Sequence, residues 1–272
     1  MAHVTVDGLK VAYERHGRSD GDALVLVAGF GMDVSSWVEQ LPAYGPWFRI
    51  YLLELRGIGG SDVPEPGYTT RDLARDVLAL CDAEDLERIH FGGFSLGGAI
   101  GLEFAAAHPE RLHSLSLHST WEATDPYPHY KNWIEVRARI IAANDPVANT
   151  GTRIVSFFSP EFINRRQDRV QAFIDKARTN PNPITPEGIA GHAHALLTHD
   201  VRERLDAIRC PTLITVGTND RTTVPSCSRL LHEAIPGSEL ILVDGAGHCT
   251  LYEAPDELNS ISLGFLMKHR CG

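Results

Sequence analysis

The stretch Ile89-His90-Phe91-Gly92-Gly93-Phe94-Ser95-Leu96-Gly97 decides how the rest of this chain is interpreted. A short apolar run leads into Gly-x-Ser-x-Gly, and the following residues 96–107 are rich in alanine and leucine up to His108-Pro109. This pattern predicts a strand, a sharp turn and a helix that proline ends. A serine on such a turn has an exposed hydroxyl and can act as a nucleophile. Ser95 is therefore the candidate nucleophile, and the alternative is a turn serine that only caps the helix.

A serine hydroxyl is a weak nucleophile unless a base takes its proton. Two later apolar runs, 212–216 and 240–243, are followed by loops that carry suitable side chains, Asp220 and His248. The chain order Ser, Asp, His is the one that accompanies this kind of turn. We expect His248 to act as the base. Asp220 should hold the imidazole ring in the correct tautomer and stabilise the imidazolium that forms. Asp244, just before His248, is interpreted as a loop-capping residue.

An acyl-transfer site also needs two N–H groups that stabilise a developing oxyanion. The first candidate is the N–H of Leu96, at the start of the predicted helix, where the helix dipole helps. The second is the N–H of Phe30, in the glycine-rich stretch 28–31 that follows the apolar run 23–27. An ordinary strand-to-helix turn is the alternative interpretation of that stretch.

The hydrophobic pattern predicts an α/β fold. Residues 3–15 alternate around Asp7-Gly8, which favours an N-terminal antiparallel hairpin. Apolar runs at 23–27, 50–53, 89–91, 115–117, 212–216 and 240–243 are typical of a mostly parallel sheet covered by helices on both faces. Between residues 121 and 199 the strand signal disappears, and the segment is predicted to be helical. We therefore expect a core of residues 1–120 and 200–272 with an inserted helical cap at 121–199.

Composition excludes several classes of function. The 272 residues carry 25 basic and 35 acidic side chains, a net charge of −10, which argues against nucleic acid and anionic membranes as partners. There is neither a run of eighteen apolar residues nor a signal-peptide pattern, and five scattered cysteines suggest no disulfide framework. We expect a cytoplasmic monomer or homodimer with a small-molecule substrate and no cofactor. His192, His194 and His199 do not have the spacing of a zinc site, so no metal is expected.

The motifs together resemble the α/β-hydrolase fold superfamily over essentially the whole chain. The matching segments are residues 29–31 with 35–37, 55–61, 93–98, 217–220 and 245–248. Two positions depart from the usual pattern, because Ala28 replaces a histidine and Glu54 replaces an aspartate. Within the superfamily the chain is similar to 3-oxoadipate enol-lactonases and aminoacrylate hydrolases, in part through a cap that resembles theirs.

This resemblance and the candidate triad lead to a functional hypothesis: a serine hydrolase that cleaves a small ester, lactone or enol-lactone through an acyl-enzyme. Hydrolysis of an activated C–N bond or a C–C bond is an alternative. A small-lactone receptor, or a cofactor-free oxygenase or perhydrolase on the same triad, is an alternative of another class. Ser95 argues against dehalogenases and epoxide hydrolases of this fold, which need an aspartate there.

The substrate pocket is expected to be mainly apolar. Candidate pocket residues are Gly29, Trp37, Trp121, Tyr127, Trp133 and Phe157, and Tyr130 is a further aromatic residue available for its roof. Arg137 and Arg139 in the predicted cap could meet a substrate carboxylate, although such arginines more often lie on solvated helix faces.

Overall fold

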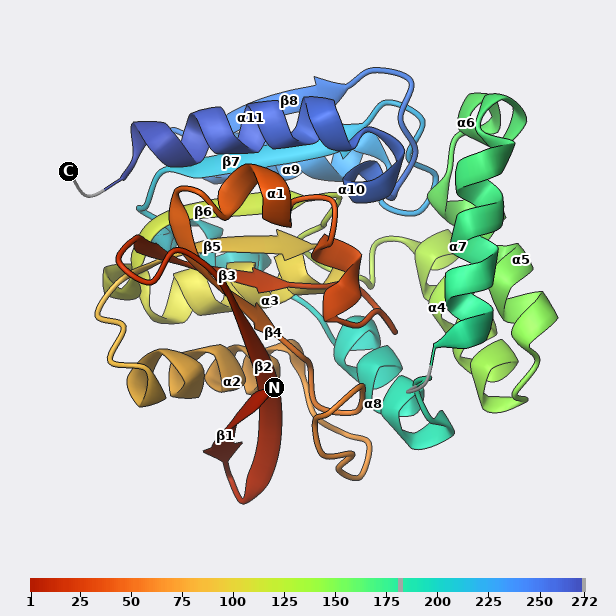
Figure 1. Cartoon of the computed structure of the whole chain (residues 1–272), viewed down its shortest axis with the longest axis horizontal. Coiled ribbons are helices and arrows are strands. Elements are labelled where there is room, and N and C mark those ends of the chain that lie inside the picture. Colours follow the sequence, from red (N-terminus) through yellow and green to blue (C-terminus); the bar gives the residue numbers. More distant parts are fainter. Residues whose placement is uncertain (181–182, 271–272) are drawn as a thin grey trace.

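The computed structural model describes residues 1–180 and 183–270 and contains one eight-stranded sheet (Figure 1). In spatial order its strands are β1 (Ala2–Val6), β2 (Leu9–Gly17), β4 (Phe48–Leu53), β3 (Asp22–Val27), β5 (Ile89–Phe94), β6 (Leu112–His118), β7 (Thr212–Gly217) and β8 (Glu239–Val243). Strands β3 to β8 pair in parallel. At one edge β1 pairs antiparallel with β2, and β2 pairs antiparallel with β4. The expected α/β fold is confirmed.

The N-terminal hairpin forms as its turn sequence predicts. Val6 pairs with Leu9, and the two residues between them have positive φ, 52° at Asp7 and 83° at Gly8. Such a turn matches the right-handed twist of the two strands, which is why Asp-Gly favours it.

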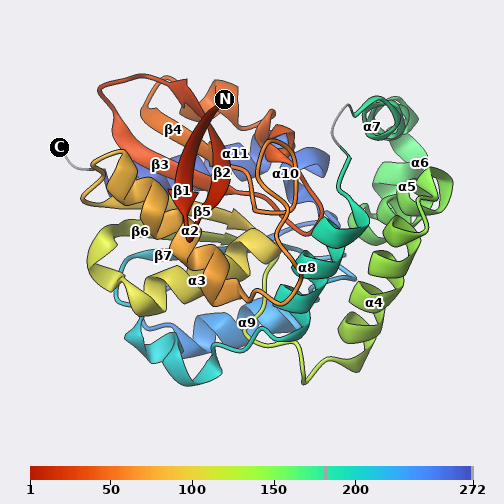
Figure 2. The ribbon, with the colours of Figure 1, turned by 90° about the horizontal axis from the view of Figure 1, so that it is seen from below.

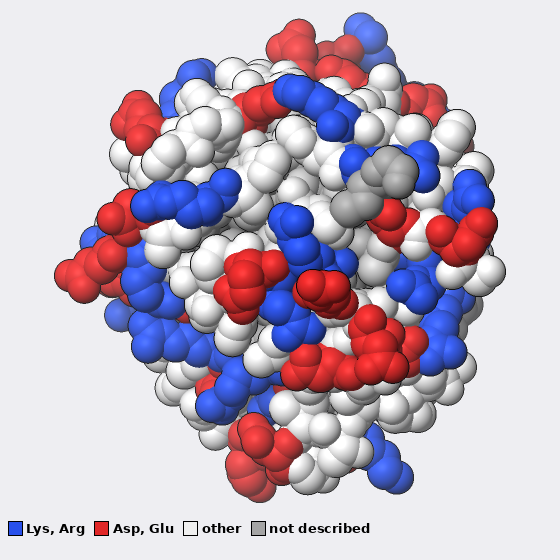
Figure 3. Space-filling model, turned by 90° about the vertical axis from the view of Figure 1, so that its left-hand side faces the viewer, with Lys and Arg blue, Asp and Glu red and all other residues white. Residues whose placement is uncertain are grey.

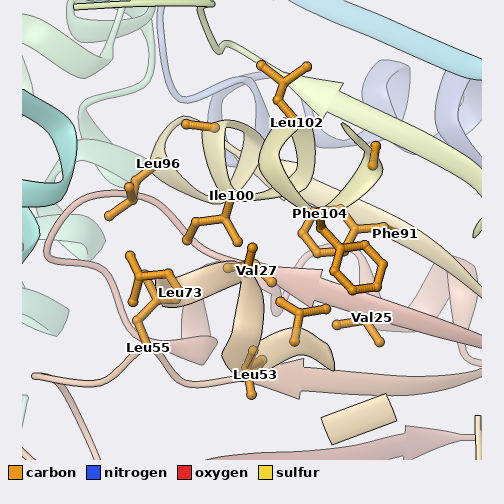
Figure 4. Packing of buried hydrophobic residues seen from close by; sticks show 14 of the residues in the cluster. Val25, Val27, Leu53, Leu55, Leu73, Phe91, Leu96, Ile100, Leu102 and Phe104 are labelled. Atoms are coloured by element: carbon orange, nitrogen blue, oxygen red, sulfur yellow. The ribbon is translucent and has the colours of Figure 1, made fainter. Parts of the chain in front are cut away.

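Helices cover both faces of the sheet (Figure 2). On one face lie α2 (Thr70–Ala83), α3 (Leu96–Ala107) and α9 (Pro225–Ala234); on the other lie α1 (Leu41–Tyr44), α10 (Thr250–Glu253) and α11 (Pro255–Lys268). Alternate residues of β3 enter the two hydrophobic clusters: Val25 and Val27 pack beneath α3, whereas Leu24 and Leu26 face α1 and α11 (Figure 4). This burial on both sides explains why the core strands read as continuous apolar runs.

Five helices separate β6 from β7 and lie at the carboxyl ends of the parallel strands (Figure 1). They are α4 (Pro128–Ala142), α5 (Pro146–Phe157), α6 (Pro160–Arg165), α7 (Gln167–Thr179) and α8 (Pro186–Leu197). Several prolines of this segment start helices, because proline is tolerated in a first turn. A bridge between Ala123 and Asp200 joins the two ends of the insertion. Three short 3₁₀ helices, at Val34–Trp37, Pro109–Arg111 and Arg202–Ala207, complete the described elements.

The end of the molecule opposite these five helices carries acidic and basic side chains side by side (Figure 3). Among the helices that the structure describes, none has the length and apolar character needed to cross a membrane.

Candidate active site

Ser95 occupies a strained turn between β5 and α3. Its φ of 54° and ψ of −113° lie in a region that side chains rarely adopt. The flanking glycines allow the turn: a Cβ on Gly93 would lie 2.3 Å from the Gly97 carbonyl oxygen, and one on Gly97 would lie 2.1 Å from that of Val27. Only glycine fits at both positions, so the Gly-x-Ser-x-Gly pattern follows from this close packing.

The structure brings Ser95, Asp220 and His248 together, although they are far apart in the sequence. The Nε2 atom of His248 lies 3.2 Å from the Ser95 Oγ, and its Nδ1 lies 2.8 Å from Asp220 Oδ2. The three residues follow β5, β7 and β8, whose carboxyl ends meet at one edge of the parallel sheet. All three side chains are buried, which strengthens the electrostatic coupling between them.

Asp220 is held in place by the loop that follows it. Its Oδ1 accepts hydrogen bonds from the N–H groups of Thr222 and Thr223, at 2.8 and 2.9 Å, and its Oδ2 accepts one from the Thr223 hydroxyl at 2.9 Å. Donors of this kind stabilise a buried carboxylate and aim Oδ2 at the imidazole. Thr223 was not among the candidate site residues, although a threonine just after a loop aspartate is a typical turn signal.

Two residues after β6 fix the backbone on either side of the site. The Thr120 hydroxyl donates to the Ser95 carbonyl oxygen at 2.9 Å, and the Ser119 hydroxyl donates to the His248 carbonyl oxygen at 3.1 Å. Both residues are fully buried. They fix the backbone of the candidate nucleophile Ser95 and the candidate base His248, and the sequence alone assigned them no such role.

The two proposed oxyanion donors are available for an acceptor. Within the described part of the chain, the N–H groups of Phe30 and Leu96 make no hydrogen bond. The turn that carries Phe30 is closed by a bond of 3.1 Å from the Met32 N–H to the Gly29 carbonyl oxygen. A Cβ on Gly29 would lie 3.1 Å from the Phe94 ring, so this candidate pocket residue serves to bring the turn close to β5.

Aromatic side chains of the cap cover the triad. The Phe157 ring centroid lies 5.5 Å from that of His248, and the Trp133 ring lies 6.1 Å from that of Phe30. Tyr130 stacks on Trp133, and its hydroxyl is buried without a hydrogen-bond partner among the described residues. Burial raises the pKa of Tyr130 well above its usual value, while the adjacent Ser95 hydroxyl lowers it. Trp133, Phe157 and Tyr130 thus form an apolar roof with one free hydroxyl.

The other candidate pocket residues lie elsewhere. Trp37 is fully buried in the core, with its ring 6.1 Å from that of His118, because the 3₁₀ helix that bears it packs inward. Trp121 is also fully buried, beneath Tyr130, and its indole N–H donates to the Thr124 hydroxyl at 2.9 Å. The Tyr127 hydroxyl donates to Glu122 at 2.7 Å.

A cavity of about 480 Å³ lies between the loop after β3 and helices α5 and α7. Gly31 and Cys249 line it, and they are the chain neighbours of Phe30 and His248. Its walls also include the charged side chains of Asp33, Arg153 and Lys176. Ser95, Asp220 and His248 are not among its lining residues.

Comparisons with known proteins agree with this geometry. The model of the alpha/beta hydrolase fold family matches residues 22–255. The chain belongs to this family. A protein of Caulobacter sp. (strain K31) named "Putative carbamate hydrolase RutD" is 32% identical over 270 residues, which is 98% of each chain. Among solved structures, a hydrolase from Pseudomonas aeruginosa is similar at 31% identity and a TM-score of 0.87, covering 97% of both chains. An enol-lactonase from Burkholderia xenovorans LB400 is similar at 26% identity and a TM-score of 0.86, covering 98% of this chain and all of its own.

In this α/β hydrolase, Glu54 has a structural role. Its carboxylate accepts hydrogen bonds from the N–H groups of Val34 and Gly60, at 3.1 and 3.0 Å, and so joins two loops beside β4. Burial raises the pKa of Glu54. The side chain therefore holds loops together, and neither its bonds nor its position beside β4 point to chemistry at Ser95.

The three clustered histidines of the hydrolase do not converge on a common point. His192 contacts the Arg56 carbonyl oxygen at 2.8 Å, His199 lies 3.1 Å from the Thr70 hydroxyl, and His194 is exposed. Across residues 1–180 and 183–270 no group of metal-ligating side chains is present. The four described cysteines are buried and free, and burial raises the pKa of Cys249 to about 12; Cys271 lies outside the described residues.

Proposed function

We propose that this α/β hydrolase is a serine hydrolase that cleaves a small ester, lactone or enol-lactone. The observation that carries the proposal is the chain of contacts from Ser95 Oγ through His248 to Asp220, at 3.2 and 2.8 Å. His248 takes the hydroxyl proton while Ser95 Oγ attacks the acyl carbon. The Phe30 and Leu96 N–H groups stabilise the tetrahedral oxyanion.

The intermediate then collapses to an acyl-enzyme, and His248 gives its proton to the leaving alkoxide or enolate. A water molecule, deprotonated by the same imidazole, attacks the acyl-enzyme and releases a carboxylic acid. The aromatic roof restricts water around the site, which favours charge stabilisation by fixed dipoles. The similarity to an enol-lactonase supports a substrate of this class.

Hydrolysis of an activated C–N bond is the second candidate, and the similarity to proteins named as carbamate hydrolases favours it. The same nucleophile, base and oxyanion donors serve both reactions. The difference lies in the leaving group, because an amine must receive the His248 proton before it can depart.

A substrate panel on the purified protein tests the proposal. It combines a short p-nitrophenyl ester, an unsubstituted lactone and a carbamate, with product acid and ammonia as readouts. We expect ester and lactone turnover that Ser95→Ala abolishes and that the control Ser226→Ala, at an exposed position, retains. Turnover of the carbamate alone would favour the second candidate. Ligand binding with negligible turnover of all three would refute the enzyme in favour of a receptor.

A further inference from the structure

Tyr130 on α4 carries a buried hydroxyl that the structure leaves unpaired. The residue is 2% exposed, and its hydroxyl has no hydrogen-bond partner among the described residues. A buried hydroxyl without a partner is costly, because it has lost its hydrogen bonds to water and gained none in return. The nearby Tyr127, by contrast, donates to Glu122 at 2.7 Å. The Tyr130 hydroxyl is therefore a donor that lacks an acceptor.

Two tryptophan rings hold the Tyr130 side chain in place. Its ring packs edge-on against Trp121, with centroids 4.7 Å apart, and stacks on Trp133 at 5.7 Å. The Trp121 indole N–H is itself bonded to the Thr124 hydroxyl at 2.9 Å. Trp133 in turn contacts the Phe30 ring at 6.1 Å, so one ring lies between Tyr130 and the side chain of the oxyanion turn. Packing on two sides fixes the direction of the hydroxyl before a substrate binds, as preorganised catalysis requires.

The Tyr130 hydroxyl lies beside the Ser95 hydroxyl, on the side of the site where the base lies. In the sheet, β5 stands between β3, which leads to the oxyanion turn, and β6. Trp121, which packs against Tyr130, follows β6. Burial raises the pKa of Tyr130, and the charge of Asp220, which follows β7, adds to the rise. Tyr130 thus approaches Ser95 from the side of β6 and β7, opposite β3.

The two sides of Ser95 serve different atoms of a reacting acyl group. The carbonyl oxygen must face the N–H groups of Phe30 and Leu96, where negative charge develops. The leaving-group atom must face the Nε2 atom of His248, which lies 3.2 Å from the Ser95 Oγ and gives the leaving group its proton. A hydroxyl on the side of the base therefore meets the leaving group rather than the oxyanion.

We propose that the Tyr130 hydroxyl donates a hydrogen bond to the leaving-group oxygen and is a further catalytic residue of the proposed reaction. An ester oxygen has two lone pairs. In the tetrahedral intermediate one of them accepts the bond from Tyr130, while the other takes the proton of the His248 imidazolium. Tyr130 transfers no proton, and its phenol stays protonated throughout. Its dipole stabilises the negative charge that develops on the departing oxygen.

This assistance matters most when the leaving group is strongly basic. A p-nitrophenolate departs readily without help, whereas an alkoxide depends on donors at the oxygen that leaves. The substrate class is then an unactivated alkyl ester or a lactone. A leaving nitrogen has a single lone pair, which takes the His248 proton, so Tyr130 adds little to the hydrolysis of a C–N bond.

The inference rests on the proposed function, and three acetate esters test it. The probes are p-nitrophenyl acetate, phenyl acetate and ethyl acetate, which share an acyl group and have increasingly basic leaving groups. In Tyr130→Phe we expect kcat/KM to fall about 10-fold for ethyl acetate, as for one lost hydrogen bond, and less than about 2-fold for p-nitrophenyl acetate. Phenyl acetate should lie between them. The retained turnover of p-nitrophenyl acetate shows at the same time that the variant is folded.

Tyr44→Phe is the control, because the Tyr44 hydroxyl is also buried and unpartnered but lies in α1. It should leave kcat/KM unchanged for all three esters. An equal loss for the three esters in Tyr130→Phe, or no loss for any, overturns the leaving-group role while the proposed function stands. So does a wild-type protein that hydrolyses p-nitrophenyl acetate alone. If no ester is hydrolysed in a Ser95-dependent way, both proposals fail.

A measurement on the wild-type protein covers the case in which Tyr130→Phe does not fold. The value of kcat/KM is determined for ring-substituted phenyl acetates and compared with the basicity of the departing phenolate. Because donors at the leaving oxygen offset its charge, kcat/KM should fall less than about 10-fold from the p-nitrophenyl to the p-methoxyphenyl ester. A steeper fall would contradict the proposal.

Discussion

At Asp220, one side chain must satisfy four donors at once. Its two oxygens accept from two N–H groups, one hydroxyl and the His248 ring, so both the charge and the orientation of the carboxylate matter. Ser95 illustrates a different demand, because its backbone strain, on the order of 1–3 kcal/mol, is retained where it exposes a hydroxyl. At the scale of single residues, the strained backbone of Ser95 lowers stability but holds its hydroxyl within reach of His248.

The substitution Asp220→Asn tests the role of the carboxylate. An amide NH₂ in place of the oxygen near Nδ1 favours the wrong imidazole tautomer, so kcat should fall by up to about 10⁴-fold. The fold should persist, because the volume is unchanged and one oxygen can still accept from the Thr222 N–H. Steady-state kinetics and circular dichroism measure the two effects. Wild-type turnover in a folded Asp220→Asn protein would assign the acid to another residue.

Tyr130 has a buried hydroxyl without a partner, directly beside Ser95. If this hydroxyl donates to bound substrate, Tyr130→Phe should lower kcat/KM about 10-fold, while the free energy of unfolding stays equal or rises, since an unpaired polar group is removed. Tyr44→Phe is the matched control, because its hydroxyl is also buried and unpartnered but lies in α1, away from the site. Unchanged kinetics in Tyr130→Phe would make this side chain a packing residue only.

At the scale of elements, short sequence signals specify where helices begin. Thr69 precedes α2. Its hydroxyl oxygen accepts a hydrogen bond from the Asp72 N–H, and its own N–H donates to the Asp72 carboxylate. These two reciprocal bonds form a capping box, and α3 begins and ends where its composition predicts. In the cap, by contrast, the number of helices and their packing could not be derived from proline positions alone.

The capping box of α2 gives a stability prediction. Thr69→Ala removes the oxygen that accepts from the Asp72 N–H and should lower the free energy of unfolding by about 1 kcal/mol. Thr69→Ser keeps an oxygen in the same place and should cost much less. Urea unfolding of the three proteins compares these values. An equal loss in both variants would show that the threonine methyl group, rather than the cap, stabilises this end of the helix.

At the scale of the whole molecule, the sheet brings together side chains from distant segments, and aromatic residues of α4 and α5 lie beside them. The fold also buries several histidines: His118, His192 and His199 are fully enclosed, and burial lowers the pKa of each to about 4. Each is therefore neutral in the native protein over a range in which an unfolded histidine, with a pKa near 6.5, is protonated.

This difference predicts how stability depends on pH. Between about pH 4 and 6.5 the unfolded chain binds more protons than the native one, so the free energy of unfolding falls as the pH is lowered. Each buried histidine should contribute roughly 2 kcal/mol of this loss between pH 7 and 5. Burial raises the pKa of Glu54 and of Glu253, and these two groups make the free energy of unfolding rise as the pH is lowered. The test therefore compares the pH dependence of single variants with that of the wild type.

The comparison uses two residues of α8. His192→Gln should flatten the pH dependence of urea unfolding between pH 7 and 5, whereas the exposed His194→Gln should leave it unchanged. If the free energy of unfolding depended on pH in the same way in both variants, His192 would not gain a proton on unfolding between pH 7 and 5.

Sequence alone determined the succession of strands along the chain, the hairpin, the helical nature of the segment between β6 and β7, and which serine, aspartate and histidine are candidates for the triad. These features depend on a few consecutive residues: turn glycines, apolar runs of strand length and capping side chains. The resemblance to α/β hydrolases rested on the same local motifs, and the family match confirms it.

Only the tertiary structure decided which side chains surround the candidate triad. Trp37 was expected in the pocket and lies in the core. Thr223 and Ser119 were not singled out, and they form hydrogen bonds with Asp220 and with the His248 carbonyl oxygen. The reason is physical. Whether a side chain faces a cavity depends on how each helix is rotated and seated on the sheet, and that is set by packing between segments many residues apart.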